Sequence, residues 1–231
     1  MKIYAISDLH LSTNCDKPMD VFGGNWEGYQ EKIIQNWSSK VKQDDLVLIA
    51  GDISWAMKLD EAVTDLEWIA KLPGTKIIIK GNHEYWWKSI SSVRSILPSS
   101  ILAIQNDAIK IGGFVVCGTR GWTVPEKDKP LEAEDEKIYK REIERLRLTL
   151  TYAKNLRQEN EKIICMIHFP PFNAAGEPSE FVNLFEEFGV SCVVFGHLHG
   201  YTNCKRVQER NGITYYFTSC DHINNDPVEI I

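Results

Sequence analysis

Five short runs of apolar residues, each followed at once by polar side chains, limit most strongly what this chain can fold into. The runs are rich in Ile and Val and predict buried strands at residues 2–7, 46–50, 76–80, 163–167 and 192–195. Helical patterns lie between them, including residues 26–41 and 60–72. The second helix is expected to have Asp60 as its N-cap and Pro73-Gly74 as its stop signal. Strands that alternate with helices favour a layered α/β fold.

The remaining segments predict a second sheet and one long helix. Residues 108–118 are expected to form two strands interrupted by Gly112-Gly113, and residues 202–219 a hairpin that turns at Asn211-Gly212. Strands of this kind favour a second, mostly antiparallel sheet. Residues 131–160 are densely charged but carry an apolar stripe, which predicts an amphipathic helix packed on the body or on a second subunit. The stripe consists of Tyr139, Ile143, Leu146, Leu150 and Ala153.

Length and composition favour one soluble domain. We expect a single α/β domain over residues 1–231, with a charged helical insertion near residues 126–160. The formal net charge of −6 argues against nucleic-acid binding through a broad basic surface. No segment approaches the ~20 apolar residues of a membrane span, and Asp8 and His10 interrupt the first run before a secretory signal can form. We therefore expect a cytoplasmic protein whose six scattered cysteines are free thiols.

Residues that can bind metal follow all five predicted strands. These residues are Asp8, His10, Asp52, Asn82, His83, His168, His197 and His199. The carboxyl ends of strands line the ligand crevice of open α/β sheets, so these side chains can converge. Residues i and i+2 of an extended segment point the same way. Asp8 with His10 can therefore approach one centre, and the pair His197 and His199 can do the same.

The ligand types indicate which metal ions are bound and how many. Imidazole, carboxylate and amide ligands together suit Mn, Fe, Zn or Co better than Mg or Ca. One four-coordinate zinc does not need so many ligands, whereas two ions ~3.5–4 Å apart that share a carboxylate do. Two aspartates leave part of the charge of two such ions uncompensated. The site is therefore expected to be a positive pocket suited to a phosphoryl group.

In their order along the chain, these motifs resemble those of the calcineurin-like metallophosphoesterases: D-x-H, G-D, G-N-H-[DE], H and G-H-x-H. All of them are present between Asp8 and His199. The resemblance implies a four-layer α/β/β/α sandwich with the site at one edge of two facing sheets. It also implies two metal centres bridged by Asp52. The ligands of one are Asp8, His10, Asp52 and His199, and those of the other are Asp52, Asn82, His168 and His197.

The resemblance implies hydrolysis of a phosphate monoester or diester, by a hydroxide that bridges two transition-metal ions. His83 would protonate the leaving group, with a merely supporting role as the alternative. The phosphoprotein phosphatase branch follows its G-D motif with an aspartate and an arginine. Ile53 follows Asp52 here, which puts a protein phosphatase activity in doubt.

The expected partner is a small phosphate-ester substrate, and whether the chain forms a homo-oligomer stays open. A nuclease of the same fold is one alternative function, although it would normally need a basic track for the phosphate backbone. A non-catalytic binding module is the other, although such a module is expected to lose ligands. Asn82 and Arg120 are candidates for substrate binding. Arg120 could hold a phosphate bidentately or form an ordinary salt bridge.

Several neighbours of the motifs have less certain roles. Trp55, Tyr85 and Trp87 could wall the substrate site or pack beneath a loop. Glu84 is expected to accept local hydrogen bonds and not to bind metal. His222 lies in a polar tail, so we leave it outside the site.

Overall fold

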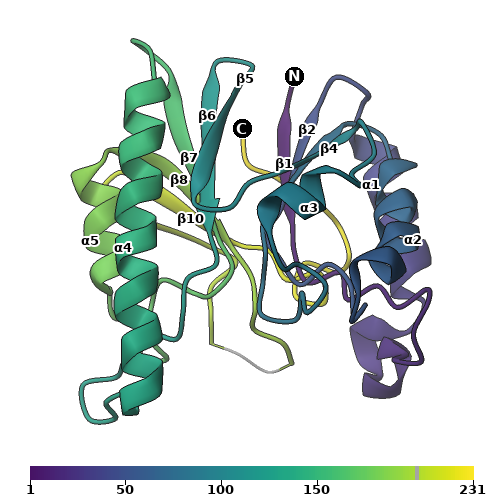
Figure 1. Ribbon diagram of the computed structural model, residues 1–231, viewed down its shortest axis with the longest axis horizontal. Coiled ribbons are helices and arrows are strands. Elements are labelled where there is room, and N and C mark those ends of the chain that lie inside the picture. Colours follow the sequence, from purple (N-terminus) through teal and green to yellow (C-terminus); the bar gives the residue numbers. More distant parts are fainter. Residues whose placement is uncertain (201–202) are drawn as a thin grey trace.

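The protein is a four-layer sandwich in the computed structural model, which describes residues 1–200 and 203–231 (Figure 1). Two β-sheets face each other in the centre. Helices α1 (Tyr29–Lys40) and α2 (Leu59–Ala70) cover one outer face. Helices α4 (Ala133–Leu156) and α5 (Glu180–Glu187) cover the other. The predicted α/β/β/α architecture is therefore confirmed.

The first sheet has the strand order β11-β1-β2-β3-β4. Its strands are β1 (Ile3–Ile6), β2 (Leu46–Ile49), β3 (Thr75–Ile78), β4 (Ile101–Ala103) and β11 (Val228–Glu229). Strands β1 to β4 pair in parallel, and β11 pairs antiparallel with β1. Three short helices also belong to this half: η1 (Met19–Phe22), η2 (Gly24–Trp26) and α3 (Ile90–Arg94).

The second sheet has the strand order β5-β6-β7-β8-β10-β9. Its strands are β5 (Asp107–Ile111), β6 (Phe114–Thr119), β7 (Lys162–Ile167), β8 (Val190–Phe195), β9 (Val207–Arg210) and β10 (Ile213–Phe217). Only the edge pairs, β5 with β6 and β9 with β10, are antiparallel. The inner strands all pair in parallel. The expectation of a mostly antiparallel sheet is therefore wrong, because each hairpin adds its inner strand parallel to the central pair β7 and β8.

Both hairpins turn where the sequence predicted. Gly112-Gly113 separates β5 from β6, and Asn211-Gly212 separates β9 from β10. The predicted second hairpin began at Thr202, which lies outside the described residues. Its first observed strand begins at Val207.

Alternation of side chains along the strands explains why the apolar runs are continuous. In β1, Ile3 and Ala5 belong to the core between the two sheets. Tyr4 and Ile6 belong to the core beneath α1 and α2. Because successive side chains of a strand point to opposite faces, a strand covered on both faces is apolar throughout. The strands that carry the candidate ligands are thus held on both sides by packed layers.

The three predicted helices keep their segments but shift their first residues. Helix α1 begins at Tyr29, because a short 3-10 helix occupies residues 24–26. The N-cap of α2 is Lys58 and not Asp60, since the Glu61 side chain accepts hydrogen bonds from the backbone N–H groups of Met57 and Lys58. Acidic residues in this first turn also complement the helix dipole.

Helix α4 carries the predicted apolar stripe. The side chains of Ile143, Leu146, Leu150 and Ala153 are buried in one core with residues of β6 and β7. The stripe therefore packs on the body of the protein, one of the two alternatives. Within the described residues, no helix is both long and apolar enough to cross a membrane.

Candidate metal centre

The candidate ligands meet at the edge where the parallel strands end. Figure 1 shows the loops that follow these strands gathered on one side of the sandwich, away from the two chain ends. Backbone hydrogen bonds join neighbouring loops: the N–H of Asp8 donates to Gly51 O (2.9 Å), and that of His10 to Asp52 O (3.0 Å). The N–H of His197, from the other sheet, donates to the Asp8 carboxylate (3.0 Å). The two sheets thus share one set of polar contacts.

Six of the candidate ligands form two groups of three. The first group is Asp8, His10 and His199, and the second is Asp52, His168 and His197. Within each group, the potential ligand atoms all lie within 4.8 Å of one another. Each group takes its carboxylate from the first sheet and at least one histidine from the second. Neither group can therefore form until the two sheets pack together.

Asp52 belongs to the second group and also faces the first. Its Oδ2 atom is 3.4 Å from Nε2 of His168 and 3.8 Å from Nε2 of His10. Asn82 joins the second group, because its Oδ1 lies 2.8 Å from both Nε2 of His168 and Nδ1 of His197. The structure therefore brings together all seven residues predicted to bind metal. The position of Asp52 suits a carboxylate shared by two ions.

The expectation that residues i and i+2 approach one centre held for only one of the two pairs. Asp8 and His10 do fall in the same group, but His197 and His199 fall in different groups. The chain is also not extended at these positions, since φ is 58° at Asp8, 45° at His10 and 76° at His197. The i and i+2 rule assumes an extended strand, and these residues lie in the turns that follow one.

Strained backbone conformations concentrate at this site. Nine non-glycine residues of the described chain have a positive φ, and five of these are asparagines, which tolerate it. The other four are Asp8, His10, Asp52 and His197. Each such residue typically costs ~1–3 kcal/mol, and this strain persists where the surrounding structure enforces it, often at functional sites.

Glycines next to the ligands allow close approach of the backbone to them. A Cβ on Gly51 would lie 2.7 Å from Nδ1 of His168 and 2.8 Å from Cα of Gly81. A Cβ on Gly81 would overlap Oδ1 of Asp52, and one on Gly196 would overlap the Asp8 carboxylate. Any larger residue at these positions would displace a candidate ligand.

Burial sets the charges of the imidazoles. It lowers the pKa of His10 to about 3 and that of His197 to about 3, so both rings are neutral at pH 7. Burial opposes the charge of His168 as well, but the adjacent Asp52 carboxylate raises the pKa of His168 to about 9. Asp52 is buried too, yet His168 holds the pKa of Asp52 below its usual range. A metal ion bound here would therefore compete with the proton on His168, whereas His10 and His197 already have the form that binds metal.

Glu84 supports the loop that carries Asp52, as expected for a hydrogen-bond acceptor. Its buried carboxylate accepts hydrogen bonds from the N–H groups of Asp52 (3.1 Å), Ile53 (2.5 Å) and Gly81 (2.5 Å). Burial raises the pKa of Glu84 to about 7. Its oxygens are thus occupied by main-chain donors and do not belong to either ligand group.

Sequence reasoning missed the residues that follow β10. Asp221 Oδ1 lies 3.1 Å from Nδ1 of His199, and Ser219 donates a hydrogen bond to the Asp8 carboxylate (2.9 Å). His222, which the sequence placed in a polar tail outside the site, lines the same cavity as His199. The signal was present, because the apolar run of β10 ends in these polar residues. The expectation of an antiparallel sheet placed these residues elsewhere, whereas β10 pairs parallel with β8 and ends at the same edge.

A cavity of about 750 Å³ opens beside the candidate ligands. We call it the aromatic cavity, because its lining includes Phe22, Trp26 and Trp55 together with His10, His83 and His199. The Trp55 ring stacks on His10, with centroids 4.9 Å apart, and lies 4.4 Å from His83. Trp55 thus walls the cavity. Trp87 does not, because it is buried in the core and its Nε1 donates to Gln105 (2.7 Å).

His83 lies beside the Asp52 carboxylate without joining either group. Its Nε2 is 3.9 Å from Oδ2 of Asp52, and its side chain is 32% exposed. Arg120 lies elsewhere: its guanidinium is 3.5 Å from the Glu142 carboxylate and 4.6 Å from the centre of the Trp122 ring. The salt bridge that the sequence left open for Arg120 is present, and contact of Arg120 with a substrate stays a prediction.

The chain is similar to several known proteins. Among solved structures, the phosphopantetheinyl hydrolase of Mycobacterium tuberculosis aligns with a TM-score of 0.56 and 15% identity, over 94% of this chain and 89% of that one. A Thermus thermophilus protein aligns with a TM-score of 0.56 and 11% identity, over 95% and 89% of the two chains. A protein of unknown function from Aquifex aeolicus aligns with a TM-score of 0.51 and 15% identity, over 98% and 94%. At these identities the likeness concerns the fold alone.

Sequence comparison adds a partial match to a further protein and a match to a family profile. An uncharacterized protein of Methanocaldococcus jannaschii is 31% identical over 88 residues, which are 36% of this chain and 47% of that protein. The aligned part thus spans about half of that relative. The profile of one family, described as calcineurin-like phosphoesterase, matches residues 1–201. These residues include every candidate ligand, and the chain therefore belongs to the calcineurin-like phosphoesterase family.

Proposed function

We propose that the chain hydrolyses small phosphate monoesters or diesters with two transition-metal ions, Mn, Fe or Zn, and that His83 is the general acid. The observation that carries this proposal is the pair of ligand groups, with Asp52 of the second group also facing His10 of the first. The donors fit metal ions, because the imidazole nitrogens and carboxylate oxygens of each group lie within 4.8 Å of one another and the Asn82 amide oxygen lies 2.8 Å from two imidazole nitrogens of the second group. Asp8, His10, Asp52 and His199 would hold one ion, and Asp52, Asn82, His168 and His197 the other.

When bound, the two ions supply a hydroxide nucleophile at neutral pH and neutralise charge on the phosphoryl oxygens. The protein's own groups orient the ester. The aromatic cavity is large enough for a small organic molecule, since ligand pockets typically have volumes of ~300–1,000 Å³. Its lining contains His10 and His199 from the first ligand group, with Trp26 and Trp55 beside them. If the phosphate group of the ester lies beside His10 and His199, its organic group would contact the indole rings of Trp26 and Trp55.

His83 is placed to deliver a proton to the departing oxygen. It lines the aromatic cavity, and its Nε2 lies close to the shared carboxylate of Asp52. Its buried Nδ1 has no hydrogen-bond partner among the described residues. A partly exposed imidazole beside the reacting group is a common general acid. This arrangement supports a role for His83 in chemistry and not in binding metal.

Metal analysis followed by an ester screen tests the proposal. After reconstitution with Mn, Zn, Fe or Mg in separate samples, we expect close to two ions per chain by elemental analysis. We then expect hydrolysis within a panel of phosphate monoesters, diesters and nucleotides. Full activity at a stable ratio of one ion or fewer would contradict the two-metal centre. A fully loaded protein that hydrolyses no ester would contradict the enzymatic function itself.

A further inference from the structure

Five of the eleven residues that line a second cavity, of about 230 Å³, are cations. We call it the basic cavity, and its cationic residues are Lys80, Lys88, Arg120, Arg141 and Arg145. The one acid among its lining residues is Glu142. Five positive charges and one negative charge leave a formal excess of four positive charges here, in a chain whose formal net charge is −6. An anion in this cavity would therefore face an excess of positive charge.

The single carboxylate is shared by all three arginines. Glu142 is fully buried, and its Oε1 lies 2.7 Å from Arg145, 3.5 Å from Arg120 and 3.9 Å from Arg141. Each guanidinium has five N–H donors, so one carboxylate satisfies only a small part of them. Lys80 donates to a neutral acceptor, the carbonyl of Trp87 (2.7 Å). Positive charge and donor capacity therefore remain in the cavity.

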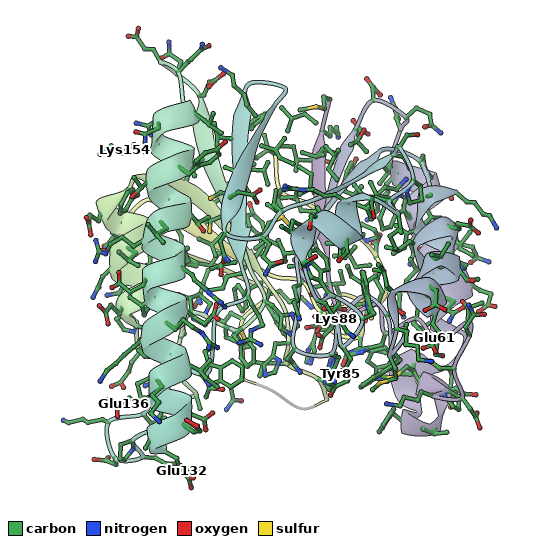
Figure 2. All side chains as sticks on the ribbon, viewed as in Figure 1. Glu61, Tyr85, Lys88, Glu132, Glu136 and Lys154 are labelled. Atoms are coloured by element: carbon green, nitrogen blue, oxygen red, sulfur yellow. The ribbon has the colours of Figure 1, made fainter. Side chains whose placement is uncertain are left out.

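The cavity lies where both halves of the molecule contribute. Arg141 and Arg145 belong to helix α4, while Lys80 and Lys88 belong to the loop that follows β3. In Figure 2, Lys88 lies between helix α4 and the helices on the opposite side. The cavity shares no lining residue with the aromatic cavity. It is therefore a separate site, even though Lys80 is only two residues from Asn82.

We propose that the basic cavity binds a tetrahedral oxyanion of the phosphate or sulfate class, either free or as part of a larger molecule. Guanidinium groups match the geometry of such oxygens and form charge-assisted hydrogen bonds with them. The small volume suits one oxyanion group. The site does not depend on the proposed metal chemistry, since none of the candidate metal ligands lines it.

Sulfate binding to the metal-loaded protein tests the proposal. Isothermal titration with sodium sulfate, at an ionic strength held constant with sodium chloride, avoids hydrolysis and general screening effects. We expect Arg141→Gln and Lys88→Gln each to weaken sulfate binding about fivefold, because each removes one charged donor. Arg147→Gln is the matched control: Arg147 lies on the same helix and pairs with Glu187, but it does not line the cavity. This control should change the affinity less than about twofold.

Equal effects of Arg141→Gln and Arg147→Gln would overturn the proposal, as would sulfate binding that depends only on the metal ions. Far-UV circular dichroism of each variant separates lost binding from lost folding. Titration with butylphosphonate distinguishes the two sources of the oxyanion. Binding much tighter than that of sulfate and still dependent on Arg141 supports a phosphate group of a larger molecule. Equal affinities for the two anions support a free oxyanion.

Discussion

The two ligand groups differ in how the fold holds them. In the first group, His199 is 31% exposed and its Nδ1 faces the carboxylate of Asp221. In the second group, His168 is fully buried, and its Nδ1 lies 2.9 Å from the backbone carbonyl of Ala50. A side-chain support can be removed by one substitution, whereas a main-chain support cannot. We therefore expect a single substitution to weaken metal binding by the first group more easily than metal binding by the second.

The largest expected effect comes from the residue that both groups would share. Asp52→Asn should lower the affinity for both metal ions by more than ~100-fold and abolish activity, because an amide offsets the repulsion between two cations far less than a carboxylate does. Asp8→Asn should mainly weaken binding by the first group. Titration calorimetry on both variants, with circular dichroism to confirm folding, measures the difference. Equal losses in the two variants would show that Asp52 is not shared.

His83 belongs to neither ligand group, so its substitution should affect the chemical step and not metal binding. His83→Ala should keep both metal ions but slow hydrolysis of an alkyl phosphate by ~10²–10⁴-fold, since an alkoxide leaves poorly without a proton. A nitrophenyl phosphate should lose distinctly less, because nitrophenolate leaves readily. Rates must be measured where the chemical step limits turnover. Equal losses on both substrates, together with lost metal, would make His83 a ligand or a structural support.

A substitution of Asp221 tests whether the side-chain support of His199 controls metal binding by the first group. Asp221→Asn should weaken metal binding by the first group by ~10–100-fold, because a carboxylate that orients a ligating imidazole also raises its basicity. The second group should keep its ion. Asp226→Asn is a suitable control, since Asp226 lies five residues on and pairs with Lys40 at the surface. Stoichiometry and affinity by calorimetry decide the outcome, and equal weakening of both ions would remove the distinction between the groups.

The smallest expected effect concerns the cavity beside the first group. Phe22 is 70% exposed and lines the aromatic cavity, whereas its neighbour Val21 is 72% exposed and does not. Phe22→Ala should lower kcat/KM for esters with a large apolar group by about three- to tenfold, as expected for lost apolar contact. Phe22→Ala should leave small polar esters, and Val21→Ala all esters, nearly unchanged. If the two variants behave alike across a panel of esters, the organic group of the substrate does not contact this wall.

Local patterns were sufficient to predict the long buried strands and the candidate ligands, but not the short edge strands β4 and β11. The runs that form β1, β2, β3, β7 and β8 are apolar because these strands are covered on both faces, and burial of this kind is visible in the sequence itself. The ligands were found because each follows such a run directly. Glu84 was expected to be a hydrogen-bond acceptor, and its contacts with Asp52 and Gly81 confirm this.

Whether neighbouring strands pair in parallel or antiparallel was harder to predict. The turn Asn211-Gly212 predicts a hairpin but says nothing of which strand pairs with β10 on its other side. Because β10 pairs parallel with β8, Asp221 emerges next to His199. The expectation of an antiparallel sheet therefore gave the wrong direction for β10 and missed the contact of Asp221 with His199.

The sequence by itself determined the layered class of the fold, the identity of the candidate ligands and the family to which they point. These features depend on residue type and on spacing along the chain. The resemblance already divided His197 and His199 between two centres, and only the tertiary structure shows the contacts that bring each residue to its group. The position of Arg120 beside Glu142 was also decided only by the tertiary structure. The physical reason is that each of these contacts joins segments far apart in the chain, so it exists only once the two sheets and helix α4 have packed together.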